Sequence, residues 1–318
     1  MISFLLHLNR LVRGVNLLII ALSMFFFRYF LIIPVLRRYL IFSTLTHLDF
    51  ALLVAGVVAI AAAGNIINDY YDMEADHKFK PGKNVIGTWI SMDNACTIQF
   101  VLNAFGIVIG YLLAWKIGNY QLGNIFAITA ILLWIYSDSL KKYFLIGNII
   151  IAALSALVFF MPVLFEQKLF KADAISNYKE AAYILIIYAK GYALFAFLIS
   201  LIREIIKDAE DKDADGYKKM KTLPIILPVW ITNAVVIFLI LIVMALLAYL
   251  QYFYWLNNQK NQFWYVLLLM QVTLMMNLIS AFFLKNSQDY KNLSVFMKLN
   301  MFFGLFSLPV FYLFSKYL

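Results

Sequence analysis

The chain of 318 residues is 64% hydrophobic and only 14% charged, with 26 basic and 17 acidic side chains and a net charge of +9. A soluble domain carries roughly 25% charged residues, so this composition excludes an ordinary soluble protein. The basic residues stand singly or in small groups, without the basic face typical of a nucleic-acid partner. The single cysteine excludes an intrachain disulfide and a cysteine metal cluster.

Nine apolar segments follow one another, each about long enough to cross a hydrocarbon layer of ~30 Å as a helix. Alternating strands of about ten residues, the pattern of membrane barrels, are absent from the sequence. Since backbones in lipid need internal hydrogen bonds, we predict an all-α polytopic membrane helix bundle in a single domain, residues 1–318. The predicted transmembrane helices are 15–36, 48–68, 98–115, 122–136, 145–164, 182–202, 225–250, 263–284 and 295–314.

The distribution of Lys and Arg predicts the orientation of these helices. The N-terminal segment and the loops after even-numbered helices contain sixteen basic residues, against nine on the opposite side. The positive-inside rule then predicts a protein of the cell membrane in which the side with sixteen basic residues faces the cytoplasm. Two charged residues, Arg28 and Lys190, interrupt predicted helices. We expect Arg28 to lie near a membrane interface. For Lys190 we favour a structural role, such as a partner for an acid or a side chain that reaches toward the membrane surface.

Ten of the 17 acidic residues lie in two short segments, 69–76 and 204–215, each at the end of a predicted helix on the same side. Aligned at an offset of 139 residues, segments 66–76 and 205–215 are identical at six of eleven positions. This match predicts two internal repeats of four helices, a common way to build a membrane site at the interface of two halves.

The spacing of these acids predicts a metal site. Residues four apart share one face of a helix, where like charges repel unless a cation lies among them. Mg²⁺ prefers hard oxygen ligands and is often shared between carboxylates and substrate phosphates. A solvated charged loop explains one acidic run, but two matching runs beside membrane helices favour metal binding. The predicted Mg²⁺ ligands are Asn68, Asp72, Asp76, Asp208, Asp211 and Asp215.

Several motifs resemble those of the UbiA superfamily of intramembrane prenyltransferases. Segment 64–76 is similar to its first signature, N-x-x-x-D-x-x-x-D, and Asp211 with Asp215 is similar to its second, D-x-x-x-D. The remaining matches are Tyr136-Ser137, Leu140-Lys141-Lys142 with Gly147-Asn148, and Lys221-Thr222-Leu223-Pro224. The resemblance covers nearly the whole chain. Three positions differ from the family pattern, namely Gly14 in place of a proline, Lys219 in place of a glycine, and Lys80-Pro81-Gly82-Lys83 in place of an Arg-Pro pair.

The resemblance implies Mg²⁺-dependent transfer of a prenyl group from a polyprenyl diphosphate to an acceptor within the membrane lipid. It implies that the metal held by Asp72, Asp76, Asp211 and Asp215 promotes departure of pyrophosphate, which makes these four residues catalytic. The substrate-binding candidates are Asn68, Lys141, Lys142, Arg203, Lys207 and Tyr136, with Lys83 and Arg13 as further phosphate ligands. Tyr136, Tyr70 and Tyr71 are candidates to stabilise an allylic cation, or are tyrosines of the membrane interface.

The acceptor has two candidate classes. The run 203–208, followed by acids and Lys-Thr-Leu-Pro, is most similar to the members that act on geranylgeranylglycerol phosphate, which implies ether formation on a glycerol-phosphate lipid. An aromatic quinone precursor such as 4-hydroxybenzoate is the alternative. A cation transporter, the non-enzyme alternative, places its paired acids near mid-membrane in broken helices. Another lipid enzyme, a CDP-alcohol phosphotransferase, requires a D-G-x-x-A-R segment that this sequence lacks.

Overall fold

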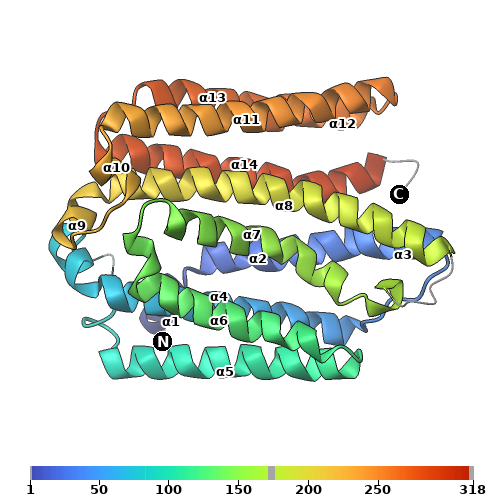
Figure 1. The fold of residues 1–318 in the computed structure, drawn as a ribbon, viewed down its shortest axis with the longest axis horizontal. Helices are drawn as coiled ribbons and strands as arrows, with labels where there is room; N and C mark the ends of the chain where they lie inside the picture. The colour runs from blue at the N-terminus through green and yellow to red at the C-terminus, as the bar shows by residue number, and fades with distance from the viewer. Residues whose placement is uncertain (1, 83, 171–175, 315–318) are drawn as a thin grey trace.

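Figure 1 shows long helices packed side by side, in a computed structural model that describes residues 2–82, 84–170 and 176–314. Within these ranges nine helices are long and apolar enough to cross a membrane, which confirms the nine predicted transmembrane helices. They are α2–η1–α3 (Gly14–Phe27, Arg28–Ile32, Ile33–Arg38), α4 (His47–Phe79), α5 (Met92–Lys116), α6 (Gly123–Asp138), α7 (Ile146–Leu164), α8 (Ser176–Glu210), α11 (Val229–Leu256), α12–η5–α13 (Lys260–Tyr265, Val266–Gln271, Val272–Phe282) and α14 (Ser287–Phe314). Short helices α1 (Ile2–Val12), η3 (Leu140–Lys142), α9 (Lys212–Tyr217) and α10 (Leu223–Ile226) connect or precede them.

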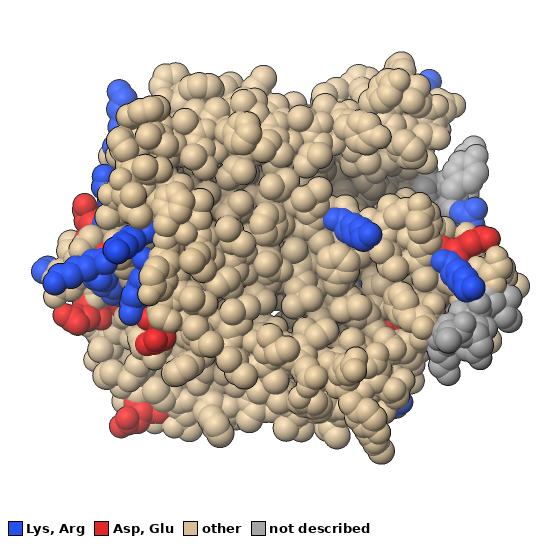
Figure 2. All heavy atoms as spheres, in the orientation of Figure 1, with Lys and Arg blue, Asp and Glu red and all other residues tan. Residues whose placement is uncertain are grey.

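The surface has the charge distribution of a multi-pass membrane protein. In the view of Figure 2, most charged side chains gather at the two ends of the helices and a largely apolar band lies between them. Most of the large hydrophobic side chains that are exposed lie on the long helices. Because water would penalise so much exposed apolar surface, this band is the part that contacts lipid.

The two helices with acidic segments are longer than the sequence predicts. We predicted ends at residues 68 and 202, whereas α4 continues to Phe79 and α8 to Glu210. Thr46 and Asp49 form a capping box that starts α4. Its 33 residues extend about 50 Å at 1.5 Å per residue, well beyond a ~30 Å hydrocarbon layer. The acidic residues therefore lie on helical turns at one end of the bundle rather than in loops.

The helices repeat at the offset found in the sequence. When 139 is added to its residue numbers, α5 (92–116) corresponds to residues 231–255. The observed helix there, α11, spans Val229–Leu256. In the same way, the transmembrane span Tyr120–Asp138 corresponds to residues 259–277, and the observed span from α12 to α13 is Lys260–Phe282. Sequence identity in the acidic segments and matching helix bounds therefore support two related halves.

The two charges inside predicted helices have different surroundings. Arg28 and Glu166 are both only 1% exposed and form an ion pair of 3.3 Å; Arg28 also donates to Leu45 O at 2.8 Å and lies 4.5 Å above the Phe50 ring. This buried network ties the loop between α3 and α4 to the end of α7, at the bundle end opposite the acidic segments (Figure 1). Lys190 instead is exposed on α8 and has no ion-pair partner among the described residues.

Small residues allow α4 and α5 to pack closely. A Cβ atom added to Gly106 would lie 2.9 Å from the carbonyl oxygen of Gly56 and 2.7 Å from the Ile60 side chain. Helices in lipid gain stability from such close van der Waals packing rather than from a hydrophobic driving force. This contact holds α4, which carries the first acidic segment, in a fixed position relative to α5.

Candidate active site

A cavity of about 760 Å³ runs into the bundle from the end that carries the acidic segments. Its walls come from α2, α4, α6, α7, α8 and α14, and its inner part is lined by apolar and aromatic side chains such as Phe126, Phe159 and Phe195. All six predicted metal ligands line it: Asn68, Asp72, Asp76, Asp208, Asp211 and Asp215. Segments that are more than 130 residues apart in the sequence therefore face one shared space.

Asp72 on α4 accepts bonds from three side chains, those of Asn68, Lys141 and Lys218. Asn68, one turn earlier, donates from Nδ2 to Asp72 Oδ2 at 3.0 Å. Lys141 Nζ donates to Asp72 Oδ1 at 2.7 Å and to Asn68 Oδ1 at 3.3 Å. Burial lowers the pKa of Lys141. The nearby charge of Asp72 acts in the opposite direction but does not outweigh burial. The predicted helical face of amide and carboxylate thus exists, and Lys141 is its positive partner.

Two further lysines link the acidic segments to each other. Lys218, which follows α9, is ion-paired with Asp72 and donates to Tyr71 O at 3.0 Å. Lys80, which follows α4, is ion-paired with Asp211 and lies 3.6 Å from Glu210. Each segment therefore supplies the lysine that neutralises an acid of the other, and the two salt bridges fix α4 against the corner between α8 and α9.

The second acidic segment keeps its helical spacing across a break between α8 and α9. The backbone N–H of Asp211 donates to Lys207 O at 2.8 Å, and that of Asp215 to Asp211 O at 2.9 Å. Asp208 accepts a 2.8 Å bond from Asn148 Nδ2 on α7. Asp215 accepts a 3.3 Å bond from the Thr222 hydroxyl. Burial and the charge of Asp72 raise the pKa of Asp215 to about 6, so the acids of the two segments repel each other.

The donor set fits Mg²⁺ shared with a substrate. In the part of the chain that the structure describes, no three acidic, histidine or cysteine side chains converge as a chelate for one ion. Instead, carboxylates and an amide oxygen face a common space from two sides. Mg²⁺ commonly takes only one or two carboxylates and completes its octahedron with water and phosphate oxygens. The residues present therefore match a metal that also binds a phosphorylated ligand.

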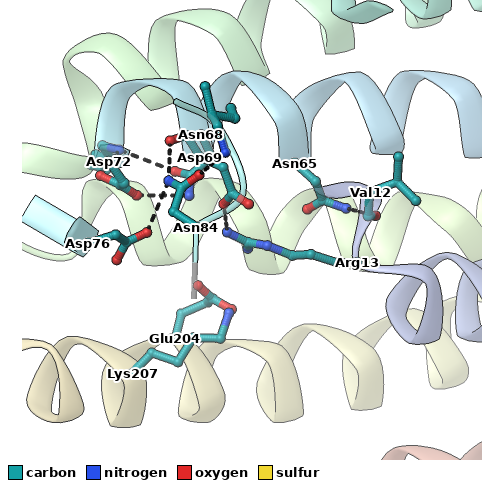
Figure 3. A network of polar contacts seen from close by, with 12 residues as sticks. Val12, Arg13, Asn65, Asn68, Asp69, Asp72, Asp76, Asn84, Glu204 and Lys207 are labelled. Atoms are coloured by element: carbon teal, nitrogen blue, oxygen red, sulfur yellow. Dashed lines mark hydrogen bonds and ion pairs between the residues drawn. The ribbon is translucent and has the colours of Figure 1, made fainter. Parts of the chain in front are cut away.

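Further polar contacts surround the first acidic segment, as Figure 3 shows. Arg13, between α1 and α2, reaches Asp69 on α4, and Asn84 donates to Asp76 Oδ2 at 3.3 Å. Glu204 and Lys207 project from α8 toward the α4 cluster and are ion-paired at 2.6 Å. The end of the cavity thus combines many acids with many bases, an arrangement suited to metal-bound phosphates.

The model of the UbiA prenyltransferase family matches residues 32–304 of the chain. The chain belongs to this family. It is therefore a prenyltransferase, and the family membership confirms the resemblance found in its motifs.

Known proteins similar to this prenyltransferase include a curated digeranylgeranylglyceryl phosphate synthase of Methanobrevibacter smithii, 29% identical over 243 residues, which are 76% of this chain and 78% of the relative. A solved digeranylgeranylglyceryl phosphate synthase has a TM-score of 0.59 at 24% identity, over 96% of this chain and 97% of its own. A UbiA homologue from Archaeoglobus fulgidus, solved with DMAPP and Mg²⁺, has a TM-score of 0.55 at 15% identity, over 95% and 99%. At these identities the two solved structures establish a common fold.

The other residues predicted to bind substrate differ in whether they line the cavity of this prenyltransferase. Tyr136, Lys141, Arg203 and Lys207 line the cavity. Lys142 is exposed and is absent from the cavity lining, and its carbonyl accepts a 2.8 Å bond from the backbone N–H of Lys221. Tyr70 and Tyr71 are likewise absent from the lining, and Lys83 lies outside the described residues. Of the three candidate tyrosines, Tyr136 is the one with access to a bound substrate.

Sequence reasoning missed three polar groups of this site. Lys80 and Lys218 were counted only as basic loop residues, although each pairs with a motif acid. Asn148 was noted as part of a motif but not as the partner of Asp208. Their one available signal was proximity in sequence to the acidic segments, because Lys218 follows Asp215 by three residues and Lys80 follows Asp76 by four.

Proposed function

We propose that this prenyltransferase transfers a geranylgeranyl-like group from its diphosphate to the hydroxyl of a glycerol-phosphate lipid, with Mg²⁺ as cofactor. The observation that carries the proposal is the convergence of both acidic segments on the mouth of one cavity with an apolar interior. The similar proteins support it, because curated relatives are named digeranylgeranylglyceryl phosphate synthases and a homologue was solved with DMAPP and Mg²⁺.

The acidic mouth would bind the diphosphate. Asn68, Asp72 and Asp76 offer oxygen ligands from α4, and Asp208, Asp211 and Asp215 offer them from the opposite wall. Bound Mg²⁺ would supply the positive charge that stabilises the departing pyrophosphate. Lys141, Lys218 and Lys80 would donate to the phosphate oxygens if bound Mg²⁺ took their place as partner of the carboxylates, since ionised donors form the stronger hydrogen bonds.

The interior of the cavity would hold the prenyl chain. Its aromatic walls exclude water from the reactive carbon, and Tyr136 lines the same cavity. A ring face stabilises a cation by about 0.5–2 kcal/mol. In the transfer, the bond from the allylic carbon to the diphosphate oxygen breaks, the bond to the acceptor oxygen forms, and the hydroxyl proton is released.

We further propose that the acidic end faces the cytoplasm of the cell membrane. The excess of Lys and Arg at this end supports that orientation. The position of the acids argues against the cation transporter, because Asp72 and Asp76 lie in the last turns of a continuous helix, whereas transporters place such acids in broken helices at mid-membrane.

The test is a transfer assay in membranes that contain the protein, with radiolabelled geranylgeranyl diphosphate as donor. Geranylgeranylglycerol phosphate and 4-hydroxybenzoate are offered in parallel, each with Mg²⁺ or with EDTA. We expect label in the lipid phosphate only when Mg²⁺ is present. Label in the aromatic acceptor alone would overturn the proposed acceptor class, and transfer that survives EDTA would overturn the metal.

A further inference from the structure

We infer that Arg203 on α8 and Lys298 on α14 form a second anion site in the cavity, which binds the phosphate of the acceptor without metal. The inference rests on the proposed function and assigns its acceptor a binding site. Both side chains line the same cavity as the acidic segments, but they do not belong to the network that surrounds Asp72 and Asp211.

Arg203 is a buried cation without a charged partner. It is 6% exposed, and its Nε has no hydrogen-bond partner. Its one described side-chain contact is weak, from Nη1 to Met301 Sδ at 3.6 Å. The adjacent acid, Glu204, is already paired with Lys207 at 2.6 Å. A buried charge that lacks a partner costs free energy, and an anion in the cavity would supply the missing bonds.

The side chain of Arg203 is directed toward α14, where other cations lie. Lys298 is three residues before Met301 and therefore on the same face of α14. Lys291 on α14 and Arg10 on α1 also line the cavity, with exposed side chains. Neither Lys298, Lys291 nor Arg10 forms an ion pair among the described residues. Arg203 and Lys298 therefore make this wall of the cavity positive.

The position along α8 separates this wall from the metal ligands. Arg203 precedes Asp208 by five residues and Asp211 by eight, which corresponds to about 7.5 and 12 Å of helix rise. The donor diphosphate has its own lysines at the acidic mouth, Lys141, Lys80 and Lys218. A phosphate monoester next to Arg203 would keep the acceptor hydroxyl inside the cavity, between this wall and the mouth. Arginine suits the task because its planar fork binds phosphate through two parallel hydrogen bonds.

The first experiment measures binding to the purified protein in detergent with EDTA present. The probes are an alkylglycerol phosphate and the same alkylglycerol without phosphate. We expect the phosphate probe to bind without metal and the uncharged probe to bind at least about tenfold more weakly, the effect expected for a hydrogen bond to a charged group. Arg203→Met and Lys298→Met should each abolish most of this preference, and Arg203→Lys should keep part of it. Lys285→Met, an exposed basic residue outside the cavity, should leave it unchanged.

The second experiment compares the two substrates in steady-state transfer. Arg203→Met should raise the KM for the phosphate acceptor about tenfold or more and leave the KM for the donor unchanged. It should also raise the melting temperature of the substrate-free protein, because the buried unpaired charge is gone; a purely structural arginine would give the opposite shift. A raised donor KM with an unchanged acceptor KM would overturn the inference.

The two proposals fail in different ways. If the wild type binds the phosphate probe but does not transfer the prenyl group to a lipid phosphate, the proposed function fails and the anion site stands. If transfer occurs and Arg203→Met and Lys298→Met both keep wild-type acceptor binding, the anion site fails and the proposed function stands.

Discussion

Replacement of Lys218 by methionine should strengthen Mg²⁺ binding to the substrate-free protein and weaken catalysis. The ammonium group of Lys218 is ion-paired with Asp72, a predicted metal ligand. In the absence of substrate, Mg²⁺ must displace this lysine or tolerate its positive charge nearby. Methionine keeps most of the length and apolar volume of the side chain and removes only the competing charge.

The size of the effect follows from the burial of the pair. The side chains of Lys218 and Asp72 are 17% and 24% exposed, so solvent screens them only in part. At an effective dielectric constant of about 20, two unit charges 4 Å apart interact by about 4 kcal/mol. Desolvation of both groups offsets much of this energy. If Lys218 weakens Mg²⁺ binding by a net free energy of about 1.4 kcal/mol, its removal changes the affinity tenfold. We therefore expect Mg²⁺ to bind about tenfold more tightly to Lys218→Met.

The assay is isothermal titration of Mg²⁺ into detergent-solubilised protein, followed by transfer kinetics. Turnover should fall about tenfold or more, because the diphosphate loses one charged donor. Lys221→Met is the matched control, since Lys221 is an exposed lysine of the same loop and is absent from the cavity lining. Unchanged or weaker Mg²⁺ binding in Lys218→Met, relative to this control, would refute the idea that lysine and metal compete for Asp72.

Three further predictions test separate parts of the structure. Asp72→Asn and Asp211→Asn should each lower the transfer rate by about 10²-fold or more without a loss of folded protein in membranes, and near-normal rates in either would remove its metal role. Arg28→Met should lower the free energy of unfolding by about 3 kcal/mol, because Glu166 stays charged, buried and unpaired; thermal unfolding in detergent measures this, and Glu166→Gln in the same chain should recover part of it. Lys219→Gly should raise the melting temperature, because Lys219 has a left-handed φ of 54° that costs a side chain about 1 kcal/mol; a lower melting temperature would contradict this.

The positive φ of Lys219 gives a reason for glycine at this position of the family pattern. The sequence shows a lysine where the family commonly has glycine, and it gives no reason for the difference. The structure shows a left-handed turn at this lysine: Lys219 N donates to Gly216 O at 3.0 Å, and Met220 N donates to Asp215 O at 3.0 Å. The turn directs the chain from α9 back toward Thr222, which donates to Asp215.

Helix ends were the least accurate part of the sequence prediction. Apolar residues define where a helix lies in lipid, but the helical backbone of α4 continues through charged residues to Phe79. Hydropathy reports contact with lipid, whereas helix length depends on backbone hydrogen bonds, which continue in water. The acidic segments therefore continue the transmembrane helices beyond the predicted ends, and Asn68, Asp72 and Asp76 lie on one helical face, as their four-residue spacing predicts.

The sequence by itself determined the class of the protein, its nine transmembrane helices, its repeat and the residues of both acidic motifs, because apolar length and residue spacing are properties of short segments. Only the tertiary structure decided which charges meet. From its motif Lys142 is a candidate to bind substrate, whereas Lys80 and Lys218 look like ordinary basic loop residues. In the structure Lys80 and Lys218 pair with acids of the site, and Lys142 lies on the surface. Electrostatic pairing depends on distances of a few ångströms between distant segments, and these distances are fixed only when the helices pack.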